Sequence, residues 1–348
     1  MYDMEKLISI IIPTYNMENY LNYCLSSLVI ERKLDLLEVI VVNDGSSDLS
    51  LEIAHKYAVE HPSTFKIIDK ENGNYGSCIN AGLAAASGKY VKILDADDSF
   101  DKHNLEEYII FLSEADADLI ISDFDIVNAD RKFVSRKTYN FLPDRVYSME
   151  QICVTQNFKD MQMHAVTYRR ENLIRSGYFQ TEGISYTDQQ WIFEPMSSVR
   201  TVMCFNKPVY QYLIGREGQT MDPAVKLRSM SHLALCVQEM LKSYLKLKSS
   251  ISECLDEYLL ARIIPLSKEV YVTLMINYSE ESKKLLLQYD AALKDINEEY
   301  YVMIASKEIS SCCGFRYIKY WRSHPEIPIR VLKIFSWTYA LMLRTKVR

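Results

Sequence analysis

The stretch Lys89-Tyr90-Val91-Lys92-Ile93-Leu94-Asp95-Ala96-Asp97-Asp98 decides how the chain is interpreted. An apolar run ends there, and three carboxylates follow within four positions. The pattern indicates a buried strand that brings acids to the carboxyl edge of a sheet, where open α/β sheets bind ligands. Clustered carboxylates repel one another unless a positive charge lies among them, and Mg²⁺ or Mn²⁺ accepts such oxygen ligands. The alternative is an acidic turn in which Asp98 or Ser99 caps a helix at 103–113.

Three more strands precede this one, and each is followed by a helix. The predicted strands are 7–12, 38–42 and 65–69, and the predicted helices are 18–29, 49–59 and one that ends near Ala86. Strand and helix alternate at a spacing of about 30 residues, which predicts a doubly wound, mainly parallel sheet. Further short strands are expected at 118–124, 165–168 and 201–205, a hairpin or flap at 128–145, and a helix at 188–198.

The pattern changes to long helical periodicity after residue 222. Helices at 223–246, 250–276 and 280–295 would pack as a bundle. We therefore predict two domains, one at 1–215, with halves at 1–100 and 101–215, and a helical one at 216–348.

Composition excludes several classes of protein. The chain has 348 residues, 48% of them hydrophobic, and a net charge of -6, which argues against general nucleic-acid binding. No C-x-x-C pair occurs among the eight cysteines, so we expect no zinc site and free thiols in a reducing cytosol. We expect no signal peptide and no membrane-spanning helix, because the apolar runs are short.

Four loops are expected at the same sheet edge, namely 13–16, 43–48, 72–76 and 95–98. A carboxylate such as Asp44 can accept a hydrogen bond from a nucleobase N–H, and a small-residue loop at a helix N-terminus can approach phosphates. The first strand-to-helix turn lacks G-x-G-x-x-G, and the chain has no G-x-x-x-x-G-K-[ST] motif. Dinucleotide-binding and phosphate-loop signatures are therefore absent.

Taken together, the loops resemble those of the family 2 glycosyltransferases. The matching segments are Ile10-Ile11-Ile12-Pro13-Thr14-Tyr15-Asn16, Val41-Val42-Asn43-Asp44-Gly45-Ser46-Ser47-Asp48, Glu71-Asn72-Gly73 with Asn80 and Gly82, and Leu94-Asp95-Ala96-Asp97-Asp98. Their order and spacing match the nucleotide-sugar half of the GT-A fold, strongly over residues 7–100 and weakly to about 215. The resemblance implies a GT-A domain, a Rossmann-like mixed and mainly parallel sheet flanked by helices, with a C-terminal helical region.

The resemblance also implies roles for individual residues. Residues expected to bind the nucleotide-sugar are Pro13, Thr14 and Tyr15 at the base pocket, Asp44 on the base edge, Asn72, Asp95 on the ribose and donor sugar, and Asp98 beside the sugar. Asp97 is expected to hold Mn²⁺ or Mg²⁺ on the diphosphate. Many family members have Arg before the equivalent of Asn80, where this chain has Ile79.

Two downstream residues are further candidates. Asp188 falls where the resemblance places the catalytic base, with Thr187 where Glu is usual; alternatively, Asp188 or Thr187 caps a helix. His164 precedes a predicted strand, where it could bind the metal or the diphosphate, although a lone histidine is more often structural.

The C-terminal segment 316–348 is basic and aromatic-rich, with eight Lys or Arg against the single acid Glu326, a local charge of +7. Such segments can lie on anionic membrane surfaces, or they can pack on a helical bundle. We expect a cytoplasmic protein with peripheral contact to the inner membrane face as one of these two alternatives.

These features lead to one expected function and two rivals. We expect a metal-dependent glycosyltransferase that moves a sugar, with inversion, from a nucleoside-diphosphate sugar (UDP-sugar favoured) to a hydroxyl of a saccharide or lipid-linked saccharide in surface polysaccharide synthesis. The rivals are a catalytically degenerate nucleotide-sugar-binding scaffold, and a nucleotidyltransferase. The latter normally needs a Gly-rich, basic loop after the first strand, which is missing.

Overall fold

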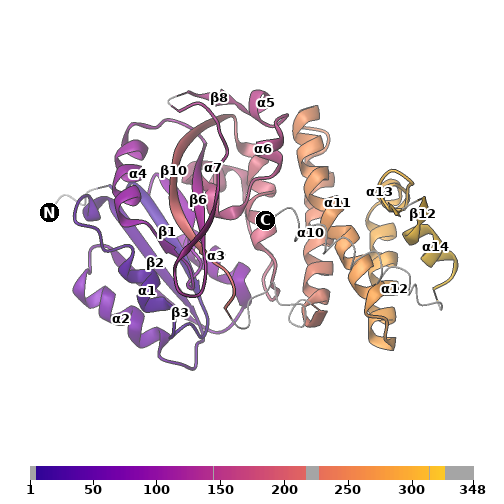
Figure 1. The fold of residues 1–348 in the computed structure, drawn as a ribbon, viewed down its shortest axis with the longest axis horizontal. Helices are drawn as coiled ribbons and strands as arrows, with labels where there is room; N and C mark the ends of the chain where they lie inside the picture. Colours follow the sequence, from indigo (N-terminus) through magenta and orange to yellow (C-terminus); the bar gives the residue numbers. More distant parts are fainter. Residues whose placement is uncertain (1–4, 144, 217–226, 313, 326–348) are drawn as a thin grey trace. The chain divides into compact units, whose positions relative to one another are not determined.

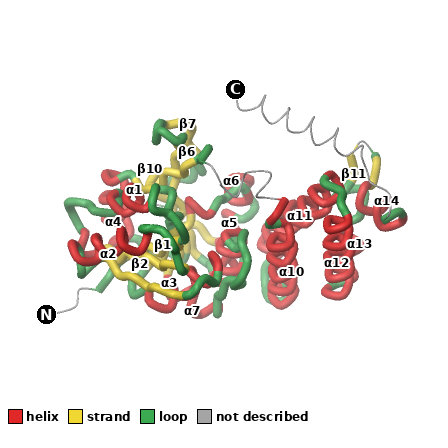
Figure 2. The backbone as a smooth tube through the Cα atoms, turned by 90° about the horizontal axis from the view of Figure 1, so that it is seen from below, coloured by secondary structure: helices red, strands yellow, loops and turns green. Residues whose placement is uncertain are grey.

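The computed structural model describes residues 5–143, 145–216, 227–312 and 314–325. The chain divides into two compact units, which are described separately. The first unit comprises Met1–Glu217 and Ser250–Tyr258, and the second comprises Gly218–Ser249 and Leu259–Arg348. Figure 2 shows that the strands gather almost entirely in the first unit, whereas the described part of the second is mainly helical.

A mixed sheet forms the centre of the first unit, with strand order β3-β2-β1-β4-β9-β6-β10-β5. The strands are β1 (Ile8–Thr14), β2 (Leu37–Asp44), β3 (Phe65–Lys70), β4 (Tyr90–Ile93), β5 (Ser99–Phe100), β6 (Leu119–Val127), β9 (Val166–Arg169) and β10 (Thr201–Leu213), with β7 (Phe133–Lys137) paired to β6 and β8 (Tyr147–Ser148) paired to β10. Strands β3, β2, β1 and β4 run parallel, and β9 is antiparallel to both neighbours. The predicted α/β sheet, mixed and mainly parallel, is confirmed.

Helices flank this sheet, as Figure 1 shows. They are α1 (Leu21–Ser26), α2 (Ser50–Glu60), α3 (Asn74–Ala85), α4 (Lys102–Glu114), α5 (Met149–Ile152), α6 (Gln156–Lys159), α7 (Arg170–Ser176) and α8 (Asp188–Trp191), with 3-10 turns η1 (Leu34–Leu36), η2 (Met163–Ala165) and η3 (Glu194–Ser198). The helix predicted at 188–198 is interrupted after Trp191, and the chain continues as η3 with Pro195 in its first turn. Proline has no N–H for a helical hydrogen bond, which accounts for the break.

The N-cap of α4 shows whether the acidic turn serves as a helix cap. Asp101 caps this helix, and its Oδ1 accepts the N–H of Asn104 at 2.9 Å. Neither Asp98 nor Ser99, the two expected caps, takes that position. The interpretation of the acidic turn as a helix cap is therefore wrong for Asp98, whose carboxylate has other partners.

The second unit contains α10 (Met230–Leu247), most of α11 (Glu253–Ile276), α12 (Glu280–Ile296), α13 (Glu298–Ile304), β11 (Ser311–Cys312), β12 (Phe315–Arg316) and α14 (Tyr317–Ser323). Arg322 anchors α14, because its Nε donates to Asp290 at 2.7 Å and its Nη1 to the carbonyl of Tyr301 at 2.8 Å. Among the described helices, none combines the length and the apolar character needed to span a membrane. The chain just after the predicted boundary between 215 and 216, at 217–226, and most of the basic tail lie outside the described residues.

A buried glutamate ties the parallel strands together. Glu38 on β2 is completely buried and accepts hydrogen bonds from Ser9, from Ser87 Oγ at 2.8 Å and from Lys66 Nζ at 2.6 Å. Burial opposes the charge, but the hydrogen bonds of Lys66, Ser9 and Ser87 outweigh it and lower the pKa of Glu38 below its usual 4.5. The carboxylate thus stabilises the fold above the pKa of the unfolded chain, and this contribution is lost as pH falls through the folded value.

We expect Glu38→Gln to lower the free energy of unfolding by about 2–3 kcal/mol at pH 7, because a buried charged hydrogen-bond acceptor is lost. The difference from wild type should shrink as pH falls below 4.5, the usual pKa of this group. Urea unfolding at pH 7 and at lower pH measures both effects. Equal stability of the two proteins at pH 7 would contradict the assignment.

The cysteines depart from expectation at one pair. Cys153 and Cys254 form a disulfide with Cα atoms 5.9 Å apart, although 101 positions separate them in sequence. The expectation of free thiols throughout is wrong for this pair, whereas Cys24, Cys78, Cys204 and Cys236 are free and buried. A pairing over such a separation leaves no local sequence signal. The cysteines therefore give no support to the predicted reducing compartment.

We expect the disulfide to make the first unit sensitive to reductant. Closing a loop of about 100 residues is worth about 4 kcal/mol or more in the chain-entropy description, so reductant should lower the melting temperature of the wild type. Cys153→Ser should melt lower without reductant and should not respond to it. Alkylation followed by mass spectrometry provides the check on bonding: labelling of Cys153 and Cys254 in denatured, unreduced protein would rule out the bond.

Candidate active site

Asp98 is fixed by β10. Its carboxylate is buried, and its Oδ2 accepts the Tyr210 hydroxyl at 2.5 Å while its Oδ1 accepts the N–H of Leu213 at 2.7 Å. Burial, with the charges of Asp97 and Asp95 added, raises the pKa of Asp98 well above its usual value. A bound cation would stabilise the ionised form of a carboxylate that is buried beside two other negative charges.

Asp95 lies at the start of the same turn. Its Oδ1 accepts the Tyr75 hydroxyl at 2.9 Å, and its backbone N–H donates to the Tyr210 hydroxyl oxygen at 3.1 Å. Burial is the main cause that raises the pKa of Asp95 to about 7, followed by the charge of Asp97, while the Tyr75 hydrogen bond opposes the rise. Asp95 and Asp98 are therefore linked through the single side chain of Tyr210.

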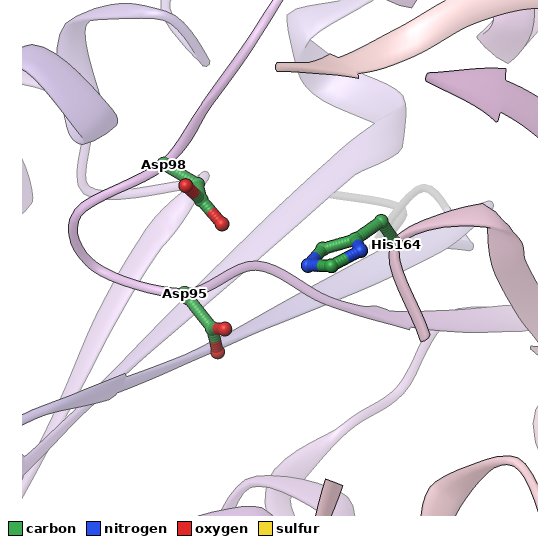
Figure 3. Close-up of side chains that lie close together, drawn as sticks. All are labelled: Asp95, Asp98 and His164. Carbon is green, nitrogen blue, oxygen red and sulfur yellow. The ribbon is translucent and has the colours of Figure 1, made fainter. Parts of the chain in front are cut away.

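His164 completes a group that fits a cation. One ligand atom each from Asp95, Asp98 and His164 lies within 4.8 Å of the others, and Figure 3 shows the three side chains around a common space. Burial, with a smaller contribution from Lys92, lowers the pKa of His164 to about 3, so the imidazole is neutral. Within the described residues its Nδ1 is buried and has no hydrogen-bond partner. Two carboxylates and a neutral imidazole are a donor set that suits Mn²⁺.

Aromatic rings and a buried lysine hold this histidine. The ring of His164 lies 5.0 Å from that of Phe124, 4.8 Å from that of Tyr210 and 4.3 Å from that of Tyr212. The ammonium of Lys92 on β4 donates to the His164 carbonyl at 2.7 Å and to the Val166 carbonyl at 3.2 Å. Burial lowers the pKa of Lys92 to about 7. The sequence run Lys89 to Asp98 thus supplies both the acids and the lysine that supports the histidine.

Asp97 has different partners from Asp95 and Asp98. Its Oδ2 accepts the Nε of Arg216 at 2.5 Å, and its carbonyl accepts the Nη2 of Arg131 at 2.9 Å. Arg216 lies over the ring of Tyr20 at 5.4 Å, and Arg131 over that of Tyr23 at 4.3 Å. Asp97 therefore lies outside the group of ligand atoms, and its role as the metal ligand stays a prediction.

The remaining donor-side candidates line the carboxyl ends of β1 and β2. Pro13 and Thr14 pair in register with Val42 and Asn43, Thr14 is buried and Tyr15 is half-exposed. Asp44 is buried, and its Oδ1 accepts Lys70 Nζ at 2.8 Å and the Gly73 N–H at 2.9 Å.

Asn72 joins the two loops through Asp44. Its Nδ2 donates to the Asp44 carbonyl at 3.0 Å. The expected base pocket is thus a set of neighbouring groups at one edge, and the individual binding roles stay predictions.

Asp188 opens α8, which is a single turn. The Gln189 amide donates to its Oδ2 at 2.8 Å, and burial raises its pKa despite that bond. Thr187 makes no capping bond in the described structure, since its hydroxyl is buried without a partner. After burial, which is the main cause, the charge of Asp188 contributes to the raised pKa values of Asp95 and Tyr75.

Close packing brings the loop before α8 against α3. The Asn80 side chain exchanges two hydrogen bonds of 2.9 Å with the backbone of Gln180. A Cβ on Gly76 would lie 2.2 Å from the Thr181 carbonyl oxygen, so only glycine fits there. Gln190 of α8 in turn accepts the Thr181 N–H at 2.9 Å. These contacts set Asp188 relative to the acidic turn.

Comparisons with known proteins identify the family of this domain. Residues 9–177 match the family model "Glycosyl transferase family 2". The chain contains a glycosyl transferase family 2 domain. Among curated relatives, the poly(ribitol-phosphate) beta-N-acetylglucosaminyltransferase TarS of Staphylococcus aureus is 28% identical over 220 residues, covering 62% of this chain and 37% of TarS. The putative glycosyltransferase EpsH of Bacillus subtilis is 35% identical over 117 residues, covering 34% of this chain and 33% of EpsH.

A solved structure extends the similarity in fold. S. aureus TarS 1–349, in complex with UDP-GlcNAc, aligns with a TM-score of 0.68 at 20% identity, covering 95% of this chain and 92% of that one. The predicted family of this domain, its GT-A fold and the helical C-terminal region are confirmed. The chain spans about a quarter to two-fifths of the length of the curated relatives it matches, so its activity, donor and acceptor are proposals.

Several residues of this site have no role in the sequence prediction, among them Tyr210 on β10. Tyr75 and Lys92 lie inside segments that this prediction used, but their side chains were given no role. Arg131 and Arg216 lie in a predicted flap and at a predicted domain boundary, far in sequence from Asp97. A usable signal was the charge of Lys92 within a buried strand, since a buried lysine requires partners.

Proposed function

We propose that the chain transfers a sugar from a nucleoside-diphosphate sugar, with a UDP-sugar favoured, to a hydroxyl of a saccharide-type acceptor, with inversion and with a divalent cation. The observation that carries the proposal is the group of Asp95, Asp98 and His164 at the carboxyl end of β4 in a family 2 domain. Asp188 lies close enough to this group to interact with Asp95.

The loops at the carboxyl ends of β1 and β2 offer groups that suit a nucleotide with a planar base and a diphosphate. Asp44 and the loop of Asn72 provide acceptors and backbone groups next to the Pro13 to Tyr15 strand end. In the proposed complex Asp44 accepts a base N–H in place of one of its present donors. UDP is the favoured nucleotide because solved complexes of the similar TarS hold UDP-GlcNAc and UDP.

The cation is Mn²⁺ or Mg²⁺, and Asp95, Asp98 and His164 would hold it. When bound, it would stabilise the negative charge of the departing nucleoside diphosphate. The imidazole favours Mn²⁺ over Mg²⁺. Arg216 pairs with Asp97, and its guanidinium also suits a diphosphate, so in the proposed complex it could exchange one anion for the other.

Asp188 is the proposed base. An inverting transfer needs one group to take the proton from the acceptor hydroxyl as the oxygen attacks the anomeric carbon. Burial raises the pKa of Asp188 towards the operating pH, which strengthens it as a base while its neighbours keep it next to the donor carboxylate. Thr187, buried beside it, takes no part in proton transfer in this proposal.

One observation favours a second candidate, a degenerate nucleotide-sugar-binding scaffold. Ile79 is fully buried where many family members carry Arg, so α3 offers no cation to a donor at that position. A nucleotidyltransferase has no such support, since the loop after β1 carries neither glycine nor a basic residue.

Release of UDP from a panel of UDP-sugars, with Mn²⁺ and saccharide acceptors, tests the proposal. Release that needs both Mn²⁺ and folded protein supports the enzyme. Binding of UDP without release from any donor and acceptor pair would favour the scaffold.

The acceptor and the location of the protein are also proposed. A surface polysaccharide or its lipid-linked precursor is the favoured acceptor, since the similar TarS is described as acting on poly(ribitol-phosphate). We propose a cytoplasmic protein that touches the inner membrane face through 316–348. In the described part of this segment, α14 buries Tyr317, Ile318 and Trp321 within the second unit and exposes Lys319 and Tyr320. Binding to anionic liposomes tests this contact, and full-length protein that ignores such liposomes would exclude it.

A further inference from the structure

Tyr75 on α3 contacts the acidic turn through its hydroxyl group. The hydroxyl of Tyr75 donates to Asp95 Oδ1 at 2.9 Å and lies 3.8 Å from the sulfur of Met163, the neighbour of His164. Tyr75 also interacts electrostatically with Asp188. Its phenol therefore lies among the donor carboxylate, the histidine segment and the proposed base, although neither composition nor motif marks it.

The backbone around Tyr75 is closely fixed. Asn74 has a φ of 64°, a left-handed conformation that asparagine tolerates better than most residues. The carbonyl of Gly73 accepts the Gly183 N–H at 2.8 Å, and Gly76 lies against Thr181 with no room for a Cβ. Gly73 and Gly76, which flank Asn74 and Tyr75, thus contact the loop that precedes Asp188, and these contacts fix the backbone that carries the phenol.

We propose that Tyr75 is a positioning residue for the donor carboxylate, through its hydrogen bond to Asp95, and thereby sets the affinity of the site for the cation and the donor. The predicted effect on donor affinity rests on the proposed function. The predicted effect on cation affinity needs only the group of Asp95, Asp98 and His164.

The chemistry of the carboxylate explains why one hydroxyl matters. An ionised Asp offers two oxygens and about four lone-pair positions. Tyr75 takes one position on Oδ1 and leaves the others for a cation or a sugar hydroxyl, while it restrains rotation of the group. Holding a ligand in its productive orientation before binding reduces the ordering that binding must supply. Phenylalanine would keep the ring in place and remove only this restraint.

Three proteins are compared in the test: wild type, Tyr75→Phe and the matched control Tyr57→Phe. Tyr57 lies on α2, and its hydroxyl donates to the Asn22 carbonyl at 3.0 Å, away from the acidic turn. Binding of Mn²⁺ alone is measured by electron paramagnetic resonance. Melting temperature and the kcat and KM for the active UDP-sugar are measured on the same samples.

We expect Tyr75→Phe to weaken Mn²⁺ binding about tenfold and to raise the donor KM by a similar factor. Its kcat should stay within about threefold and its melting temperature close to wild type, because uniform binding rather than the reacting atoms is affected. Tyr57→Phe should match wild type in Mn²⁺ binding and KM. Unchanged Mn²⁺ affinity in a folded Tyr75→Phe protein would overturn the proposal, as would an equal loss in Tyr57→Phe. A wild type that binds Mn²⁺ but turns over no donor contradicts the proposed function instead, and the Mn²⁺ comparison still decides this inference.

Discussion

Asp95→Asn is expected to reduce sugar transfer by at least about 100-fold and to abolish Mn²⁺ binding at the site. The amide keeps the size of the side chain but loses the charge that a hard cation requires. Loss of one preorganised group that stabilises transition-state charge typically costs two to three orders of magnitude in kcat. Transfer from the active UDP-sugar at saturating donor and Mn²⁺ provides the measurement.

Asp116→Asn is the control for this change. This variant makes the same exchange of carboxylate for amide on the surface of the same unit, where Asp116 pairs with Arg169. It should transfer sugar at the wild-type rate. If Asp95→Asn retained more than about a tenth of the wild-type rate, the group of Asp95, Asp98 and His164 would not be the cation site.

Asp188→Asn is expected to lower kcat by about 100- to 10,000-fold, the usual contribution of a general base. UDP affinity should stay within about threefold of wild type, because the base acts on the acceptor hydroxyl and not on the nucleotide. Rapid-mix kinetics for kcat and calorimetry for UDP binding give the two numbers on one preparation.

Glu171→Gln on the exposed face of α7 is the matched control and should behave as wild type. A loss of UDP binding in Asp188→Asn that parallels the loss of kcat would show a structural role, such as holding the loop before α8. A wild-type kcat in that variant would move the search for the base elsewhere.

The parallel part of the fold was predictable because it depends on local pattern. The β-branched runs of β1 and β2 are buried on both faces, and such strands show as continuous apolar sequence. The later strands were harder. β10 runs for 13 residues with Pro208 within it and register shifts around that residue, and the sequence indicated only its first five positions.

The acidic turn shows how far sequence reasoning reaches within a site. Three neighbouring carboxylates indicated a cation site, but not which of them would share it. Asp97 pairs with Arg216, 119 positions away in sequence, whereas Asp98 accepts a hydrogen bond from Tyr210 on β10. Such choices depend on contacts between segments that only the folded chain brings together.

The folded chain gives His164 and Thr187 surroundings that the sequence does not reveal. A lone histidine has no spacing signal, and only its neighbours Asp95 and Asp98 indicate a ligand. Thr187 replaces the expected glutamate, and the structure shows a buried hydroxyl that does not cap α8. Of the Glu-Asp pair that the family resemblance implies here, this chain therefore keeps only the aspartate, Asp188.

The central claim is a cation-dependent nucleotide site at the carboxyl end of β4. Calorimetric titration of UDP into the wild type, with and without Mn²⁺, tests it most directly, with Asp95→Asn alongside. The account predicts UDP binding that Mn²⁺ strengthens at least about tenfold and that Asp95→Asn returns to the metal-free value. UDP binding of equal strength with and without Mn²⁺, or no binding by well-folded protein, would contradict it.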